Sequence, residues 1–385
     1  MNGTELRQKL KKASRIVVKV GSRVLVQRTG RPDLRRIKTL VRDLAALQER
    51  GHEVVLVSSG AIGTGVHTLG MSTRPTTLPE LQMAAAVGQT RLMTLYDQLF
   101  SKHGCKIGQV LLTHADLNDR RRHLNARNTM QALLRNGIIP IVNENDVVAV
   151  DEIKFGDNDL LASLVALLIE ADLLILLTTV DGFRMPAGAG RTRRVSFLEQ
   201  VTDDVLGFAV GKGSNLSTGG MSSKLQAAGT VARMGASVVI ANGRKDGILT
   251  QVVAGQDTGT LLANVSASTE PSLNGRKRWI AFFHKAQGSL TVDNGARDAI
   301  IGKGKSLLPI GIREVEGDFE AGAVVTLKTL DGLSFARGLT DYAASDIRQI
   351  KGRKTSEIEA LLGSRDYDEV IHRDNLVVTG IENGS

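Results

Sequence analysis

Residues 217 to 228, STGGMSSKLQAA, combine two adjacent glycines, several small hydroxyl side chains and one lysine where a helical pattern begins. Backbone N–H groups at the start of a helix are unpaired donors with partial positive charge, and glycine lets such a backbone approach an anion closely. A flexible turn ahead of a surface helix, with an ordinary surface lysine, is the alternative. The phosphate-binding interpretation makes candidates of Gly219 and Gly220, for a backbone cradle, and of Lys224 on the following helix.

Lys19 is the second candidate cation. It interrupts an otherwise apolar run, IVVKVG (16–21), and an ammonium group is costly to bury unless it faces a cleft or an anion. Two fixed cations suit phosphoryl transfer, because they stabilise the charge on the oxygens of the moving group. We therefore expect Lys19 and Lys224 to meet in one phosphate site, although they are far apart in the sequence.

Carboxylates are concentrated in VNENDVVAVDEIKFGDNDLLASLVA (142–166), near the expected end of a strand and start of a helix. Asp157 and Asn158 are good helix-capping residues, so capping explains part of this stretch. Alternatively, Asp146 and Asn158 hold the ammonium group or an amide edge of a substrate. Asp159 is a candidate for orienting the two lysines or a magnesium ion.

Apolar runs of four to six residues alternate with helical patterns through the first two thirds of the chain, which predicts a parallel sheet covered by helices. Strands are expected at 16–20, 54–57, 107–112, 138–142, 173–177 and 237–241. Ligands of open α/β sheets bind at the carboxyl ends of the strands. We therefore expect the polar segments that follow four of these strands to converge at one edge: KVGS (19–22), SSGAIG (58–63), NEND (143–146) and TTVDG (178–182).

Composition changes near residue 263. The segment NVSASTEPSLNGRKR (264–278) is polar and lacks an apolar period, as a linker does. Short apolar runs separated by glycine-containing turns follow it and indicate a small β-rich unit. We expect an α/β domain over residues 1–265, a linker over 266–278, a β-rich domain over 279–365 and a C-terminal tail over 366–385.

The overall composition is that of a globular cytoplasmic protein. Of 385 residues, 42% are hydrophobic, and the one cysteine, Cys105, excludes an internal disulfide. The N-terminus lacks the apolar core of a signal peptide, and we expect no membrane segment. The formal charge of +9 raises the question of nucleic-acid binding, but residues 275–385 carry 16 basic and 16 acidic side chains. The whole positive excess therefore lies in the part of the chain that holds the glycine loop.

Single-loop nucleotide motifs do not account for these residues. No segment fits GXXXXGK[ST], and no GXGXXG follows the first strand. A phosphate site must therefore be assembled from several loops.

The motifs, taken in order, resemble those of the amino acid kinase family: KVGS (19–22), VSSGAI (57–62), NEND (143–146), KFGDND (154–159), LLTTVDG (176–182) and STGGMSSKLQAA (217–228). They are most similar to the members that phosphorylate glutamate, and the C-terminal portion resembles the PUA domain that many of these members carry. The resemblance implies a three-layer α/β sandwich with a mainly parallel sheet. It also implies transfer of the ATP γ-phosphate to the γ-carboxylate of L-glutamate, the first step of proline synthesis.

The resemblance assigns roles residue by residue. Lys19 and Lys224 would hold the phosphates and the transition state, with Asp159 orienting them. The glutamate-binding positions of the family match Ser59, Asp146 and Asn158. Thr178 and Thr179 match the nucleotide-binding pair, but members often have Thr-Asp there, so the side chain of Thr179 departs from the family pattern while its backbone contacts are still expected. The complete set implied for ATP is Lys19, Thr178, Thr179, Thr218, Gly219, Gly220, Met221, Ser222, Ser223 and Lys224.

The resemblance further implies Mg²⁺ with ATP, inhibition by proline and a homo-oligomer, either a dimer or a tetramer. A carboxylate acceptor is already ionised near pH 7, so the reaction needs no general base. The sequence names no protein ligand for magnesium. Aspartate, acetylglutamate, carbamate or uridylate as acceptor remain alternatives, and so does RNA binding through the PUA domain, which the neutral charge of residues 275–385 disfavours.

Overall fold

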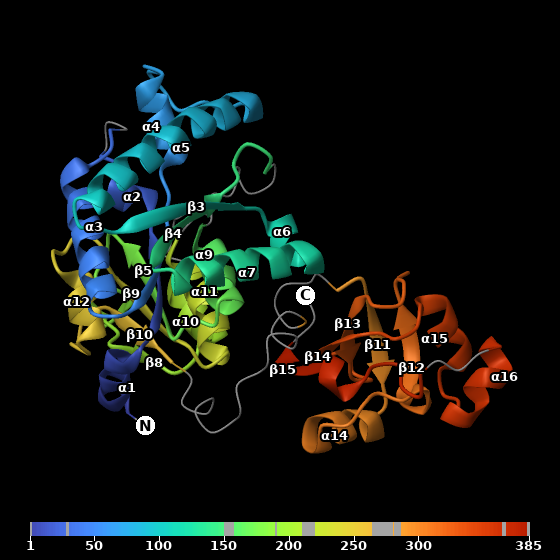
Figure 1. The fold of residues 1–385 in the computed structure, drawn as a ribbon. Helices are drawn as coiled ribbons and strands as arrows, with labels where there is room; N and C mark the ends of the chain where they lie inside the picture. The colour runs from blue at the N-terminus through green and yellow to red at the C-terminus, as the bar shows by residue number, and fades with distance from the viewer. Residues whose placement is uncertain are drawn as a thin grey trace. The chain divides into compact units, whose positions relative to one another are not determined.

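The computed structural model describes residues 2–27, 31–149, 158–188, 191–209, 220–263, 280, 286–363 and 367–382. The chain divides into two compact units, Met1–Ser272 and Leu273–Ser385 (Figure 1). The linker expected at 266–278 lies outside the described residues, so the expected domain boundaries stay a prediction.

The first unit is built on one eight-stranded sheet. The strand order is β3-β4-β2-β1-β5-β9-β10-β8, and neighbours are parallel except for the antiparallel pair β9 and β10. All six expected strands are present, and the two not expected, β8 and β10, are too short to show a period in the sequence. The strands are β1 (Arg15–Val20), β2 (Glu53–Val57), β3 (Lys106–Leu112), β4 (Ile138–Glu144), β5 (Leu173–Thr178), β8 (Phe197–Leu198), β9 (Ser237–Asn242) and β10 (Thr260–Leu262), with a separate pair β6 (Arg184–Pro186) and β7 (Thr192–Arg194).

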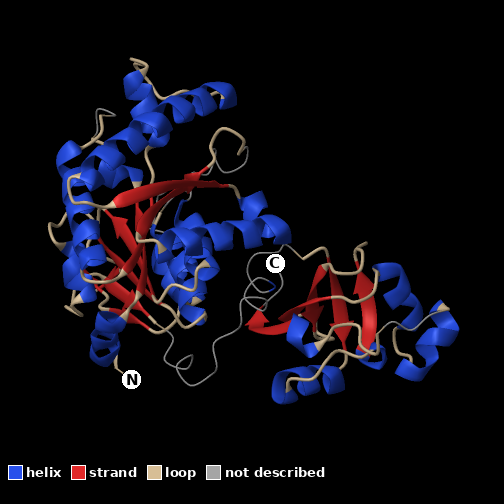
Figure 2. Cartoon of the chain, in the orientation of Figure 1, coloured by secondary structure: helices blue, strands red, loops and turns tan. Residues whose placement is uncertain are grey.

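Helices cover both faces of this sheet (Figure 2). One layer consists of α3 (Leu34–Glu49), α5 (Leu78–Ser101) and α12 (Ile248–Val253), and the other of α7 (Arg120–Arg135), α9 (Asn158–Leu168) and α11 (Met221–Arg233). The expected three-layer α/β sandwich is therefore confirmed. The unit also contains the short helices α1 (Gly3–Lys9), α2 (Ser22–Leu25), α4 (Ala61–Thr68), α6 (His114–Asn118) and α10 (Asp203–Ala209).

The alternation of side chains along β1 decides where Lys19 points. Ile16, Val18 and Val20 belong to the core beneath α3, α5 and α12. Successive side chains of a strand point to opposite faces, so Lys19 faces the layer that contains α9 and α11. An ammonium group is thereby placed between the sheet and two helices.

Helices α4 and α5 touch backbone to backbone. A Cβ atom at Gly65 would lie 1.7 Å from the carbonyl oxygen of Ala84, and one at Gly88 would lie 1.8 Å from that of Ala61. Only glycine fits such an approach. The long helix α5 therefore fixes the first turn of α4, which follows β2.

The second unit has a five-stranded sheet in the order β12-β11-β13-β14-β15. The C-terminal tail expected at 366–385 instead contains β15, which pairs with β14 because Leu376 and Val377 are buried in the core of this unit. The elements are β11 (Gly288–Val292), α14 (Asn294–Lys303), β12 (Ile312–Glu316), β13 (Val324–Lys328), β14 (Ser334–Leu339), α15 (Ala344–Ile350), α16 (Ile358–Leu362) and β15 (Leu376–Glu382). Across the described residues of both units, no helix has the length and apolar character needed to cross a membrane.

Candidate active site

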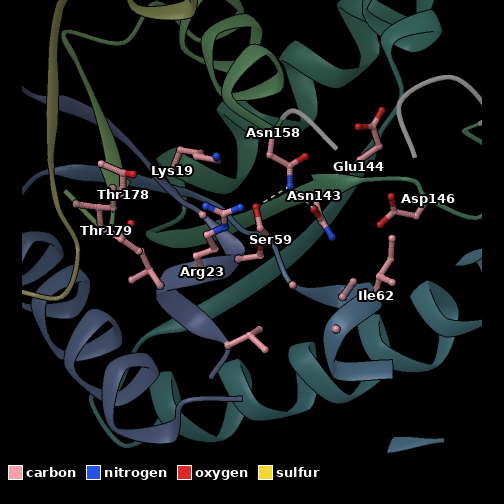
Figure 3. A pocket seen from close by; sticks show the side chains of 18 of the residues that line it. Lys19, Arg23, Ser59, Ile62, Asn143, Glu144, Asp146, Asn158, Thr178 and Thr179 are labelled. Atoms are coloured by element: carbon pink, nitrogen blue, oxygen red, sulfur yellow. Dashed lines mark hydrogen bonds between the residues drawn. The ribbon is translucent and has the colours of Figure 1, made fainter. Parts of the chain in front are cut away.

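A pocket of about 470 Å³ opens where β1, β2, β4 and β5 end (Figure 3). The convergence of polar strand ends expected from the sequence is therefore present, because parallel strands bring their carboxyl ends to one edge. The sequence-predicted residues that line this pocket are Lys19, Ser59, Asp146, Asn158, Thr178, Thr179, Gly220 and Lys224.

Two lysines and one aspartate form the buried part of the site. The Nζ atom of Lys19 donates to Oδ1 of Asp159 at 2.6 Å, and Nζ of Lys224 donates to Oδ2 at 2.8 Å. Asp159 has no exposed surface, and the two lysines are 5% and 6% exposed. One carboxylate thus spaces and orients two ammonium groups, while the trio keeps a net charge of +1.

The fold brings these three groups together from distant segments. Asp159 is the second residue of α9 and Lys224 the fourth residue of α11, and these two helices pack on each other beside β1. Burial acts to raise the pKa of Asp159, but the charges and hydrogen bonds of the two lysines outweigh burial and hold that pKa below its usual value. The carboxylate is therefore ionised at neutral pH.

Asn158 organises the neighbouring part of the pocket. Its Nδ2 atom donates to the carbonyl oxygen of Ser58 at 2.8 Å, to Oγ of Ser59 at 2.9 Å and to Oδ1 of Asn143 at 3.1 Å. Asn143 in turn donates to Oε1 of Gln89 on α5 at 2.9 Å. Because Ser59 Oγ accepts from Asn158, its own hydroxyl proton can be donated to a ligand.

Helix α5 also contacts the residue that follows β2. The hydroxyl groups of Ser58 and Tyr96 lie 2.9 Å apart. Burial raises the pKa of Tyr96 to about 12, so the phenol is neutral at neutral pH. The same helix thus positions β2, Asn143 and the first turn of α4.

Asp146 lies at the opposite end of the pocket from Lys19 and Thr178 (Figure 3). Burial raises its pKa to about 6, against the lowering effect of the Arg74 guanidinium. Burial thus disfavours the ionised form of Asp146, and a cationic ligand next to the carboxylate would favour that form.

Among the described residues, no side chain caps the start of α11. Gly220 is the residue before the helix, and it supplies no side-chain hydrogen bond to the first-turn N–H groups. The side chain of Ser223 is used locally, since Oγ donates to the carbonyl oxygen of Gly220 at 3.1 Å. Thr218 and Gly219 lie outside the described residues, and Met221, Ser222 and Ser223 are not among the pocket-lining residues.

Several lining residues were given no individual role from the sequence. Asn143 and Glu144 lie within the NEND motif, and their position at the end of a strand was the available signal. Arg23 and Arg74 also line the pocket, but arginines between the main strands and helices usually face solvent, so no pattern in the sequence singles them out.

The described residues contain no group of three or more histidine, cysteine or carboxylate side chains that could hold a metal ion. The pocket instead has a cationic end, with Lys19, Arg23 and Lys224, and an end where Glu144 and Asp146 lie with Arg74. Such a division suits two ligands, one polyanionic and one bearing an ammonium group.

Comparisons with known proteins show the family of this chain. Residues 14–242 match the amino acid kinase family and residues 288–362 match the PUA domain. Glutamate 5-kinase from Syntrophus aciditrophicus is 49% identical over 96% of both chains, and that from Moorella thermoacetica is 47% identical over 99% of this chain and 100% of its own. Among solved structures, carbamate kinase from Giardia lamblia bound to AMP-PNP aligns with 66% of this chain and 99% of its own, with a TM-score of 0.48 and 16% identity. By its family match and its full-length relatives, the chain belongs to the glutamate 5-kinases of the amino acid kinase family.

Proposed function

We propose that this protein transfers the γ-phosphoryl group of ATP to the γ-carboxylate of L-glutamate, forming L-glutamyl 5-phosphate and ADP, the first step of proline synthesis. The observation that carries the proposal is the joint placement of the Lys19–Asp159–Lys224 trio and of Ser59, Asn158 and Asp146 in one pocket. In the reaction an oxygen of the carboxylate forms a bond to the γ-phosphorus. The bond from that phosphorus to the β–γ bridging oxygen breaks, and its electron pair leaves with ADP.

The two lysines supply the electrostatic part of catalysis. Charge grows on the bridging oxygen and on the transferred oxygens, and fixed ammonium groups in a site screened from water stabilise it without reorganising. Asp159 keeps both ammonium groups at fixed positions through bonds of 2.6 and 2.8 Å. No proton has to move, because the acceptor is already ionised.

The acceptor end fits an amino acid. Asp146 offers a carboxylate to the substrate ammonium group, and the Ser59 hydroxyl can donate to a substrate carboxylate. The N–H groups of Asn158 are used within the protein, so this residue mainly holds Ser59 in place. These roles agree with the motif positions of the family and are proposals for this chain.

The nucleotide end fits ATP phosphates. The uncapped first turn of α11 and Lys224 can bind phosphate oxygens, since helix N-termini favour anions. Thr178 and Thr179 line the same end and are assigned to the nucleotide. We assign Thr218 and Gly219 to the same loop on their motif alone.

Mg²⁺ completes the proposed substrate complex. Because the described residues form no metal cluster, the ion is expected to be held mainly by phosphate oxygens and water, with its charge offsetting that of the nucleotide. Protein ligands for magnesium are not assigned.

Further properties rest on the resemblance. Proline carries the carboxylate and amine of an amino acid, so we propose that it inhibits by occupying the end of the pocket near Ser59 and Asp146. A cytoplasmic homo-oligomer and a kinase domain over 1–265 remain proposals, and so does a PUA domain that begins near residue 279 and, with β15, extends beyond residue 365. RNA binding by the second unit is the weaker alternative, because its basic and acidic residues balance.

The test is a coupled assay of ADP release with glutamate, aspartate, acetylglutamate and uridylate as acceptors. We expect turnover with glutamate and at least 10²-fold lower kcat/KM with the others, about 3 kcal/mol of discrimination. Preference for another acceptor would contradict the proposal.

A further inference from the structure

Arg23 contributes a third cation, besides Lys19 and Lys224, to the phosphate end of the pocket. It lies on the short helix α2, directly after β1, and lines the pocket together with Lys19 and Ser59. In Figure 3 its guanidinium extends into the pocket on the side of Lys19, towards Ser59. The side chain therefore reaches the region between the phosphate end and the acceptor end.

The helix that carries Arg23 is firmly anchored. Its neighbours Val24 and Leu25 are 4% and 1% exposed, and both belong to the core of the first unit. The carbonyl oxygen of Arg23 accepts a hydrogen bond from Nη2 of Arg244 at 3.0 Å. A backbone fixed in this way keeps the exposed guanidinium at the pocket without using it for packing.

The guanidinium is not engaged elsewhere in the part of the chain that the structure describes. No hydrogen bond or ion pair joins it to another described residue, whereas Asp159 already binds both lysines. The pocket carboxylates Glu144 and Asp146 lie on the far side of Asn143 from Arg23 (Figure 3). Arg23 thus keeps its donors available on the phosphate side.

A further cation on the protein suits the reaction, in addition to the magnesium ion expected with ATP. The γ-phosphoryl group and the attacking carboxylate are both anions, and the buried trio offers them a net charge of only +1. A guanidinium presents several N–H donors in one plane, so it can contact oxygens of two groups at once, which an ammonium group does less well.

We propose that Arg23 is a catalytic residue whose guanidinium bridges the transferred phosphoryl group and the acceptor carboxylate. This inference rests on the proposed function for the identity of the two groups. The bridge is strongest when the two oxygens are closest, in the transition state, so it affects kcat more than the binding of either substrate.

The experiment compares Arg23→Gln and Arg23→Lys with the parent and with Arg35→Gln, which removes an exposed arginine of α3 that is not among the pocket-lining residues. We expect Arg23→Gln to lower kcat about 10- to 100-fold with KM for glutamate and ATP within about threefold, and Arg23→Lys to lie between it and the parent. Arg35→Gln should behave as the parent.

Two results would overturn the bridge. One is a kcat of Arg23→Gln within threefold of the parent. The other is an unchanged kcat with a raised KM for glutamate, which would make Arg23 a ground-state acceptor contact. If the parent prefers another acceptor, the proposed function is wrong. The role of Arg23 is then still tested by the ratio of kcat between Arg23→Gln and the parent, measured with that other acceptor. Arg23→Lys gives the same test if Arg23→Gln does not fold.

Discussion

The substitution Asp146→Asn is expected to stabilise the folded protein and at the same time to weaken its use of glutamate. Burial raises the pKa of this carboxyl from 3.8 to about 6, so holding it ionised at pH 8 costs about 3 kcal/mol at 1.36 kcal/mol per pKa unit. The substitution to asparagine removes this cost, but the amide group also loses solvation on burial, which offsets part of the stabilisation. We expect the free energy of unfolding to rise by about 1–2 kcal/mol at pH 8.

The pH dependence of this gain has a definite sign. Folding raises the pKa of this acid, so the folded state binds a proton more readily than the unfolded state. The parent is therefore most stable below the unfolded pKa, and this stability is lost as the pH rises through the folded pKa. The advantage of the variant should therefore grow from pH 4 to about pH 6 and then stay constant. Denaturant unfolding followed by circular dichroism at pH 5 and pH 8 measures it, with Asp97→Asn, an exposed aspartate of α5, as the matched control.

Catalysis should change in the other direction. Loss of the carboxylate that meets the substrate ammonium group is expected to raise KM for glutamate on the order of 10²-fold, with KM for ATP within threefold. In the parent, kcat/KM for glutamate should fall below about pH 6, and the variant should lack this limb. Equal changes in both KM values, or a variant that is less stable at pH 8, would refute the reasoning.

Three further outcomes follow from the packing. Asp159→Asn leaves two buried ammonium groups without their carboxylate, so the free energy of unfolding should fall by about 3–5 kcal/mol and turnover should be lost, as measured by denaturant unfolding and the coupled assay. Gly88→Ala places a methyl group 1.8 Å from the Ala61 carbonyl oxygen, so it should lower the unfolding midpoint and raise KM for glutamate, whereas Gly207→Ala, with nothing within 4 Å, should do neither. A chain ending at Ser272, the boundary of the first unit, should fold and phosphorylate glutamate with altered proline inhibition; loss of turnover in a monodisperse protein would show that the second unit completes the site.

The sequence alone predicted the main strands of the sheet and the three charged residues at the centre of the site, Lys19, Asp159 and Lys224. Long apolar runs predicted the six principal strands, and the polarity of Lys19 within such a run indicated a cleft. The pairing of Lys19 and Lys224 through Asp159 required only that helices α9 and α11 start at the same edge of a parallel sheet.

Other parts of the site depend on tertiary packing that leaves no local pattern. Gly65 and Gly88 resemble any helical glycine in the sequence, and only the contact between α4 and α5 shows that a side chain is excluded there. Arg23 and Arg74 occur in connecting segments, and their place in the pocket follows from how α2 and α4 are anchored. A strand as short as β10 has too few residues for alternation to be visible.

Trapping the acyl phosphate with hydroxylamine tests the central claim most directly. The full chain is incubated with Mg-ATP, glutamate and hydroxylamine, and ADP and hydroxamate are quantified for the parent and for Lys224→Met, which keeps most of the side-chain length but removes the charge. The account predicts γ-glutamyl hydroxamate in equal amount to ADP, and a kcat lower by about 10²-fold or more in the variant. ADP formation without γ-glutamyl hydroxamate, or a folded Lys224→Met variant within about threefold of the parent, would contradict it.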